Sequence, residues 1–353
     1  MFAVVHDEPP LRSRQGPSLT LHEYKGEELN PAIHVLLPHN LRAREFLNLF
    51  PKANSSPAYT FPALYNWVSR TLSNLTLQEN ESHPFRKHPY KLREIDVQSV
   101  DWFWRNRPGQ DDKLGFMKIQ AKIETDPYVH DGEKNERADW LPGAVFLRGG
   151  SVAILIIVQP ADAEGDDEKH VILTIQPRIA AGSLAFAEIP AGMLDGDTFK
   201  GSAASEIEEE AKLKVKESDL INMTELALQD TSSNSKQNSP EPETRAFTED
   251  TESALYPSPG ACDEFIPLFL CKKRLTRRHM DWLKGKATGL RDEGENITLK
   301  LVPLSTAWRE GARDAKALAA LALYENLKRE GKLPPMPSEV ESEPEELDPK
   351  DTT

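Results

Sequence analysis

Apolar runs and helical periodicities alternate along the second half of the chain. The run VAILIIV at 152–158 is continuous and short, which is typical of a buried strand. FIPLFLCK (265–272) and ITLKLVP (297–303) predict two further strands, and the Ala/Leu-rich segment 312–331 predicts a closing helix. This order of strands and helices favours one α/β domain with a mixed sheet between helices.

The first half has weaker patterns. The first forty residues show no sustained periodicity, and 41–78 predicts two helical pieces split by a Pro/Ser turn. Segment 88–125 alternates around an Arg-Pro-Gly turn, which predicts antiparallel strands. We therefore expect an N-terminal extension with short helices over 1–87, a small antiparallel β module over 88–140, and the α/β domain over 141–330.

Acidic residues concentrate in two segments that are poor in apolar side chains. Residues 229–253 carry six acids and two bases, and residues 331–353 carry seven acids and two bases. Such segments bury too little surface to offset the entropy of ordering, so we expect a disordered insert and a disordered acidic tail. The net charge of −14 also argues against general binding of nucleic acid, which requires a basic face.

The number of cysteines and the length of the apolar runs indicate the cellular compartment of the protein. Cys262 and Cys271 form neither a disulfide framework nor a zinc motif, which favours free thiols in a reducing compartment. No apolar stretch is long enough to cross a membrane, and the first residues lack the apolar core of a signal peptide. We expect a cytoplasmic protein without membrane contact, with an organelle as the alternative.

Negative charge crowds one expected helix, AASEIEEEA at 203–211. At 100° per residue, Glu206, Glu209 and Glu210 share one face, and the opposite face carries Ala204, Ile207 and Ala211. Like charges at these spacings oppose helix formation. Either the face is simply solvated, or divalent cations such as Mg²⁺ or Mn²⁺ offset the repulsion.

The sequence before this helix, EIPAGMLDGD (188–197), gives a strand end, a bend and a turn. This loop–helix–loop resembles the Nudix box, G-x5-E-x7-R-E-U-x-E-E-x-G-U with U apolar. Gly192 matches the first glycine, and EIEEEAKL (206–213) matches the second half. The spacing is one residue short and the first glutamate is missing; Ser205 replaces the arginine, and Lys212 replaces the late glycine. The resemblance implies that Glu206, Glu209 and Glu210 bind the metal, helped by the Ala191 carbonyl.

Segments outside the box resemble the ADP-ribose and ADP-sugar pyrophosphatase branch of the family, particularly its plant-type members. They are LRGGSVAILIIV, IQPRIAAG, EIPAGMLD, YPSPGACDEFIPLFL and GLRDEGENITLKLVP, in this order between 147 and 303. The resemblance implies a Nudix α/β/α sandwich that hydrolyses ADP-ribose or ADP-glucose to AMP and a sugar phosphate with Mg²⁺ or Mn²⁺. It also implies a homodimer paired through 88–125. Alternatives are another nucleoside diphosphate substrate, or a nucleotide-binding module without turnover.

The resemblance also suggests residues that contact the substrate. Arg178 stands where an arginine binds the diphosphate in this branch, a role that suits a guanidinium; otherwise it is a surface residue at a strand end. Trp102 and Trp104 could stack on adenine, or could simply pack within the module.

Loop glutamates are the candidates for handling the attacking water. In related enzymes a glutamate of the last loop orients or deprotonates this water. Glu295 is our first choice, followed by Glu293 and Glu264. Without the resemblance, each would be interpreted as an ordinary solvated carboxylate.

Overall fold

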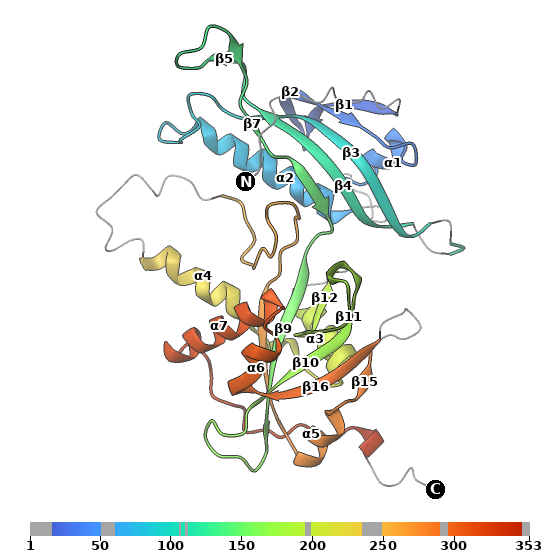
Figure 1. Ribbon diagram of the computed structural model, residues 1–353, viewed down its shortest axis with the longest axis vertical. Helices are drawn as coiled ribbons and strands as arrows, with labels where there is room; N and C mark the ends of the chain where they lie inside the picture. The colour runs from blue at the N-terminus through green and yellow to red at the C-terminus, as the bar shows by residue number, and fades with distance from the viewer. Residues whose placement is uncertain are drawn as a thin grey trace. The chain divides into compact units, whose positions relative to one another are not determined.

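The computed structural model describes residues 16–50, 61–105, 107–109, 112–194, 199–234, 249–289 and 296–347 (Figure 1). The chain divides into two compact units. The first comprises Met1–Arg148, Glu241–Thr251 and Ser258–Asp263, and the second comprises Gly149–Pro240, Glu252–Pro257 and Glu264–Thr353. In the described residues, no helix is both long and apolar enough to span a membrane.

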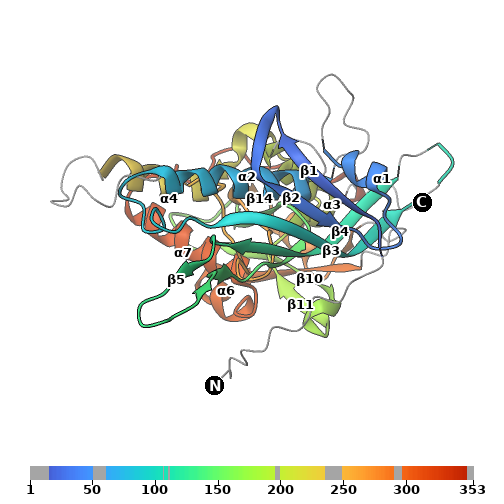
Figure 2. The ribbon, with the colours of Figure 1, turned by 90° about the horizontal axis from the view of Figure 1, so that it is seen from above.

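The first unit is built on a sheet with the strand order β1-β2-β3-β4-β7, in which β8 also pairs with β4. Strands β1, β2, β3 and β4 of this sheet are labelled in Figure 2. Its elements are β1 (Ser18–Tyr24), β2 (Glu27–Leu36), α1 (Ala43–Leu47), α2 (Pro62–Thr76), β3 (Lys91–Trp104), β4 (Lys113–Glu124), β7 (Trp140–Leu141) and β8 (Ala144–Leu147). A separate hairpin joins β5 (Tyr128–Val129) and β6 (Glu136–Arg137). The antiparallel pairing of β3 with β4 confirms the strands expected over 88–125.

The predicted boundary at residue 87 is wrong, because strands on both sides of it share one sheet and one core. β2 pairs with β3 in parallel, with His34 opposite Glu94, so the module is not purely antiparallel either. Ile33, Val35 and Leu37 are buried at alternate positions. This apolar alternation is short and lies between two prolines, which hid the strand in the sequence.

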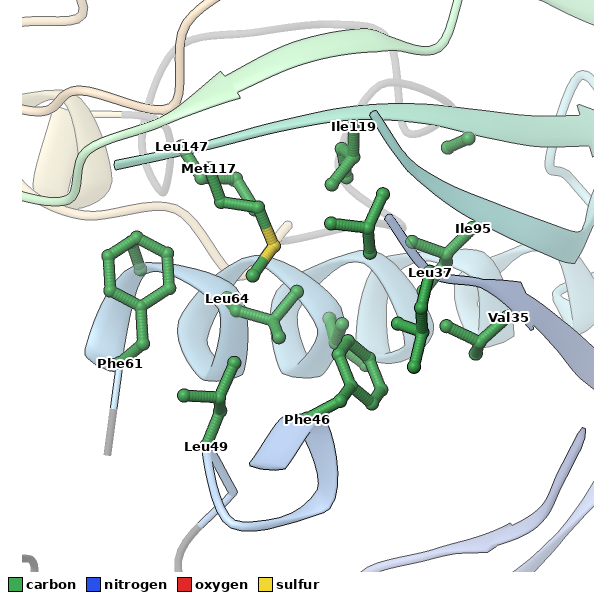
Figure 3. Close-up of a cluster of buried hydrophobic side chains, with 14 of the residues drawn as sticks. Val35, Leu37, Phe46, Leu49, Phe61, Leu64, Ile95, Met117, Ile119 and Leu147 are labelled. Atoms are coloured by element: carbon green, nitrogen blue, oxygen red, sulfur yellow. The ribbon is translucent and has the colours of Figure 1, made fainter. Parts of the chain in front are cut away.

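One cluster of buried apolar side chains fills the first unit (Figure 3). Leu64 on α2 points toward Met117 of β4, and Ile95 of β3 belongs to the same cluster. Leu147 of β8 belongs to the same cluster, and β8 pairs with β4. The expected start of the α/β domain at residue 141 is therefore too early, since the second unit begins at Gly149.

The second unit has a mixed sheet with the order β13-β14-β9-β10-β16-β15. Its strands are β9 (Ser151–Pro160), β10 (His170–Arg178), β11 (Ser183–Glu188), β12 (Ala191–Met193), β13 (Ile221–Asn222), β14 (Leu268–Leu275), β15 (Ala287–Thr288) and β16 (Ile297–Pro303). β14 runs parallel to β9, whereas β10 pairs antiparallel with β9 and β16. β11 and β12 pair with β10 and β9 respectively.

Helices cover both faces of this sheet. They are α3 (Phe199–Ala211), α4 (Met223–Asn234), α5 (Arg277–Leu283), α6 (Leu304–Glu310) and α7 (Ala315–Arg329). Along β9, the even-numbered positions 152–158 join the core beneath α3 and α5, and the odd-numbered positions 153–157 join the core beneath α6 and α7. The continuous apolar run thus serves two cores, which confirms the predicted α/β/α sandwich with a mixed sheet.

The acidic tail is ordered over part of its length, which corrects the prediction for 331–353. Val340 forms a parallel bridge to Arg274 at the end of β14, and the Glu341 amide donates to the Arg274 carbonyl at 2.8 Å. Lys273 pairs with the Glu341 carboxylate at 3.0 Å. Composition indicates how little apolar surface a tail can bury, but not that strand β14 offers cations and a free edge to hold it.

The predicted insert is only partly described. Helix α4 continues to Asn234, five residues beyond the expected start of the insert at residue 229. Residues 235–248 lie outside the described part of the chain.

Candidate active site

The site is centred on a short strand, β12, and the helix that follows it. β12 pairs with β9, with Gly192 opposite Val152. The glycine is required by close packing, because a Cβ built on Gly192 would lie 1.5 Å from Oε1 of Glu206. The Glu206 carboxylate therefore lies directly against the strand, and the glycine that matches the family pattern has a steric reason.

Helix α3 orients the glutamates through its apolar face. Ala203, Ile207 and Ala211 are fully buried under the sheet. Ala203 takes the buried place that the sequence had assigned to Ala204, which is only partly buried. The helix is thereby held so that Glu210, four residues after Glu206, points toward β12.

Glu210 is a buried carboxylate, only 5% exposed. The Ala191 amide donates a hydrogen bond of 3.2 Å to its Oε2. Burial, followed by the nearby charge of Glu206, raises the pKa of Glu210 to about 8. Two carboxylates share a poorly solvated place here, and they are the hard oxygen ligands that Mg²⁺ and Mn²⁺ prefer.

The third predicted ligand differs from these two. Glu209 is exposed, as are Glu208 and Ser205 on the same helix. In the part of the chain that is described, no group of three or more His, Cys, Asp or Glu side chains has the arrangement of a metal site. Glu206 and Glu210 supply two carboxylates that would suit a divalent cation. The metal-binding roles of Glu206, Glu209, Glu210 and the Ala191 carbonyl stay predictions.

At the end of α3, a lysine replaces the late glycine of the family pattern, and this change affects the backbone. Lys212, at the position of the late glycine, has φ 55°, in the left-handed region that glycine favours. Leu213 next to it is buried, and its amide donates to the Ile207 carbonyl at 3.5 Å. The backbone takes the left-handed conformation that favours glycine, although a lysine occupies the position.

Of the three loop glutamates predicted to handle the attacking water, the structure describes only Glu264. Glu264 accepts a hydrogen bond of 2.9 Å from the Ser151 hydroxyl, and Ser151 lies opposite Met193 in the ladder between β9 and β12. Glu264 therefore lies at the same end of the sheet as the glutamates of α3. Glu293 and Glu295 fall in 290–295, outside the described residues, so their roles stay predictions.

Arg178, at the end of β10, forms an ion pair with Glu188, which no sequence pattern had indicated. Its Nε donates to Oε1 of Glu188 at 2.6 Å; the Glu188 side chain is 3% exposed and that of Arg178 is 42% exposed. The negative charge of Glu188 and the positive charge of Arg178 both act on Glu210. Arg178 thus lies within electrostatic range of Glu210, and its role in binding a diphosphate stays a prediction.

Two more charged residues complete this network from helix α7. Lys316 Nζ lies 3.0 Å from Oε2 of Glu188 and 2.9 Å from Oδ1 of Asp314. Asp314 caps α7 by accepting from the Lys316 amide, and its other oxygen accepts from the Ile189 amide at 3.1 Å. An aspartate before an Ala/Leu-rich helix is a recognisable cap in the sequence, but its bond to residue 189 depends on the tertiary fold.

The two candidate adenine-binding tryptophans belong to the first unit, whereas the glutamates belong to the second. The Arg105 guanidinium lies 4.7 Å from the centre of the Trp102 ring, and Lys113 Nζ lies 5.3 Å from that of Trp104. Trp102 also packs against the buried cluster of its own unit. These contacts fit packing within the unit, and adenine stacking stays a prediction.

Comparison with known proteins identifies the family. None of the protein-family models matches the chain. The curated protein Nudix hydrolase 14, chloroplastic, from Arabidopsis thaliana is 35% identical over 269 residues, which cover 75% of this chain and 71% of that protein. A solved structure described as an ADP compounds hydrolase covers 69% of this chain and 99% of its own, but at 15% identity and a TM-score of 0.32 this likeness is too low to define a fold. The chain belongs to the Nudix hydrolase family and is a Nudix pyrophosphohydrolase.

Proposed function

We propose that this enzyme hydrolyses the diphosphate bond of a nucleoside diphosphate sugar, ADP-ribose or ADP-glucose, to AMP and a sugar phosphate. The observation that carries the proposal is the pair of carboxylates on α3, Glu206 against Gly192 and the buried Glu210 bonded to Ala191. The choice of ADP-sugars rests on the five sequence segments that resemble the ADP-sugar branch.

Mg²⁺ or Mn²⁺ is the metal that these residues would hold, with Glu206 and Glu210 as the best supported ligands and Glu209 as the third. When bound, it would supply positive charge for the negative charge that develops on the diphosphate. The raised pKa of Glu210 fits this role, because its carboxylate must lose a proton before it can coordinate a cation.

The protein's own residues would bind the diphosphate and the water. Arg178 would hold the diphosphate, since a guanidinium can donate two parallel hydrogen bonds to phosphate oxygens. Glu295 remains our first choice for orienting or deprotonating the attacking water. Glu264, which Ser151 orients, is the candidate among the described residues.

The test is Mg²⁺-dependent release of phosphate, coupled to a phosphatase, over a panel of ADP-, UDP- and GDP-sugars. We expect ADP-ribose or ADP-glucose to give the highest kcat/KM, and no release in EDTA. Preference for a UDP- or GDP-sugar would reassign the substrate. Nucleotide binding by calorimetry without release of phosphate from any member of the panel would indicate a binding module.

We also propose that the enzyme is a homodimer that pairs through its first unit. Phe116 packs against Phe103 and Phe146, with ring centres 5.3 and 5.4 Å apart. Phe103 and Phe146 are 40% and 42% exposed, and aromatic rings of this kind gain from a dry partner surface. Light scattering at micromolar concentration should give twice the chain mass, and a monomer mass would contradict the proposal.

The compartment has two candidates. The sequence predicts the cytoplasm, whereas the name of the Arabidopsis relative places that protein in chloroplasts. Microscopy of the full chain with a C-terminal fluorescent protein would separate a diffuse cytoplasmic signal from an organellar one.

A further inference from the structure

A buried charge network joins the first turn of α7 to the bend that carries the active site. Two carboxylates, Glu188 and Asp314, are 2% and 3% exposed, and two cations, Arg178 and Lys316, contact them. The network contains two charges of each sign and is therefore neutral. A buried carboxylate normally requires such pairing, because an unpaired charge is costly away from water.

Within this network, Glu188 divides its two oxygens between the cations. Oε1 accepts from Arg178 Nε at 2.6 Å, and Oε2 accepts from Lys316 Nζ at 3.0 Å. The Lys316 side chain is 16% exposed, whereas that of Arg178 is 42% exposed. Lys316 is therefore the inner partner of the carboxylate, and Arg178 is the one whose guanidinium reaches solvent and can meet a ligand.

Because Glu188 contacts two cations rather than one, Arg178 can be available to a diphosphate ligand. If Arg178 alone balanced Glu188, a bound diphosphate would compete with a buried carboxylate for the same guanidinium. With Lys316 present, part of the negative charge of Glu188 is offset from the inside, although Lys316 is shared with Asp314. The carboxylate can then fix the orientation of Arg178 without consuming its whole charge.

We propose that Lys316 is a positioning residue of this Nudix hydrolase: it acts through Glu188 to keep Arg178 oriented and available for the diphosphate of the substrate. The idea rests on the proposed role of Arg178 in diphosphate binding. It assigns to α7, which lies outside the Nudix box, a function in substrate affinity. Lys316 itself need not touch the substrate.

A double-mutant cycle tests this proposal on the full chain, with inorganic pyrophosphate and Mg²⁺ as the probe and calorimetry as the readout. Lys316→Met keeps the length of the side chain and removes its charge, so we expect pyrophosphate affinity to fall about tenfold. Lys316→Arg should restore most of it. In an Arg178→Met background, Lys316→Met should have no further effect, because the residue through which it acts is gone.

A matched control is Lys300→Met, since Lys300 is an exposed lysine of the same unit that pairs with Glu310 at 2.6 Å. It should leave pyrophosphate affinity unchanged. A purely structural Lys316 would lower the melting temperature while pyrophosphate affinity stayed that of the wild type, or would weaken binding equally in both backgrounds; either result overturns the proposal. A wild type that does not bind pyrophosphate overturns it as well.

Kinetic measurements with ADP-ribose test the role of Lys316 separately from the proposed substrate. If ADP-ribose is hydrolysed, Lys316→Met should raise KM about tenfold while kcat changes less. Should Lys316→Met fail to fold, Lys316→Gln, which retains a hydrogen-bond donor, replaces it in the same cycle. A wild type that binds pyrophosphate but turns over none of the ADP-sugars would refute the proposed substrate and leave the cycle fully interpretable.

Discussion

Two buried glutamates of the second unit, Glu188 and Glu210, have opposite electrostatic surroundings. Glu188 is 2% exposed and pairs with two cations, Arg178 and Lys316. Glu210 is 5% exposed and accepts a hydrogen bond from the Ala191 amide, and among charged side chains Glu206 has the largest effect on its pKa, which it raises. The fold thus pairs one carboxylate directly with cations and places the other beside a like charge.

The difference separates a carboxylate that holds neighbouring cations in place from one that is poised to bind a cation. A glutamate with two cation partners is held in place, and removing either partner would leave a buried charge uncompensated. A buried glutamate beside a second carboxylate costs stability unless something positive arrives, and groups perturbed in this way concentrate at functional sites. These surroundings support the proposed role of Glu210 as a ligand of a divalent cation.

The largest expected effect comes from removing the negative charge of Glu210. Glu210→Gln should lower turnover at least roughly a hundredfold, because a neutral amide is a poor ligand for a hard cation. Its folding stability should be unchanged or higher, since repulsion from Glu206 disappears. Glu208→Gln is the control, because Glu208 is exposed on the same helix and should tolerate the change. Wild-type turnover in Glu210→Gln would remove Glu210 from the metal site.

The next prediction concerns pH and the metal-free protein. Glutamate titrates near 4.5 in the unfolded chain and at about 8 at position 210 of the folded chain. The folded state therefore binds an extra proton between these values, so the stability linked to Glu210 is full below pH 4.5 and is lost as pH rises toward 8. The loss is on the order of a few kcal/mol.

Melting curves in EDTA between pH 5 and pH 8 would measure this loss. The decline in melting temperature should be smaller in Glu210→Gln, which has no proton to lose, and smaller in saturating Mg²⁺, which replaces the proton. Identical pH profiles for wild type and Glu210→Gln in EDTA would show that Glu210 is not the group responsible.

Much of the fold could be predicted because the second unit has strong local patterns. The run at 152–158 and the strand at 297–303 lie where the sequence indicated, and α7 falls within the predicted segment 312–331. Strand β2 was missed, because only three alternate apolar residues mark it. Its partner β3 begins at Lys91, more than fifty residues away, so no local pattern could indicate their pairing.

The sequence could predict only those parts of the candidate site whose residues lie close together along the chain. Glu206 and Glu210 are one helical turn apart, so a periodicity argument places them on one face. Glu188, Asp314 and Lys316 were missed because 126 positions of sequence separate the strand end from the helix cap that meets it. Charge balance across such a distance depends on the tertiary fold and cannot be inferred from spacing.

A third glutamate, largely but not fully buried, extends the comparison to the tail. Lys273 and Glu341 are 13% and 14% exposed and lie 3.0 Å apart, so this glutamate is also balanced and should be structural. Lys273→Met should cost about 1–3 kcal/mol of unfolding free energy, measured in urea, without changing kcat. Lys284→Met is the control: Lys284 pairs with Asp281 at 2.6 Å with both side chains more than half exposed, and its loss should cost well under 1 kcal/mol. A change in kcat but not in stability for Lys273→Met would contradict the structural assignment.

The smallest expected effect lies at the end of the helix that carries Glu210. Lys212 has φ 55°, a backbone conformation that costs a residue with a side chain roughly 1–2 kcal/mol and costs glycine little. Lys212→Gly should therefore raise the unfolding free energy by roughly 0.5–1 kcal/mol, once the stability lost to the greater freedom of glycine in the unfolded chain is subtracted.

Two control variants separate backbone strain from charge. Lys212→Ala removes the same charge but keeps the strained backbone, so it should not stabilise the protein. Lys214→Gly, two residues on and without a positive φ, should destabilise it. If Lys212→Gly and Lys212→Ala changed the urea midpoint equally, the effect would come from charge. If only the glycine variant is more stable, the helix of the unbalanced glutamates ends in strained backbone, and the late glycine of the Nudix pattern has a conformational explanation.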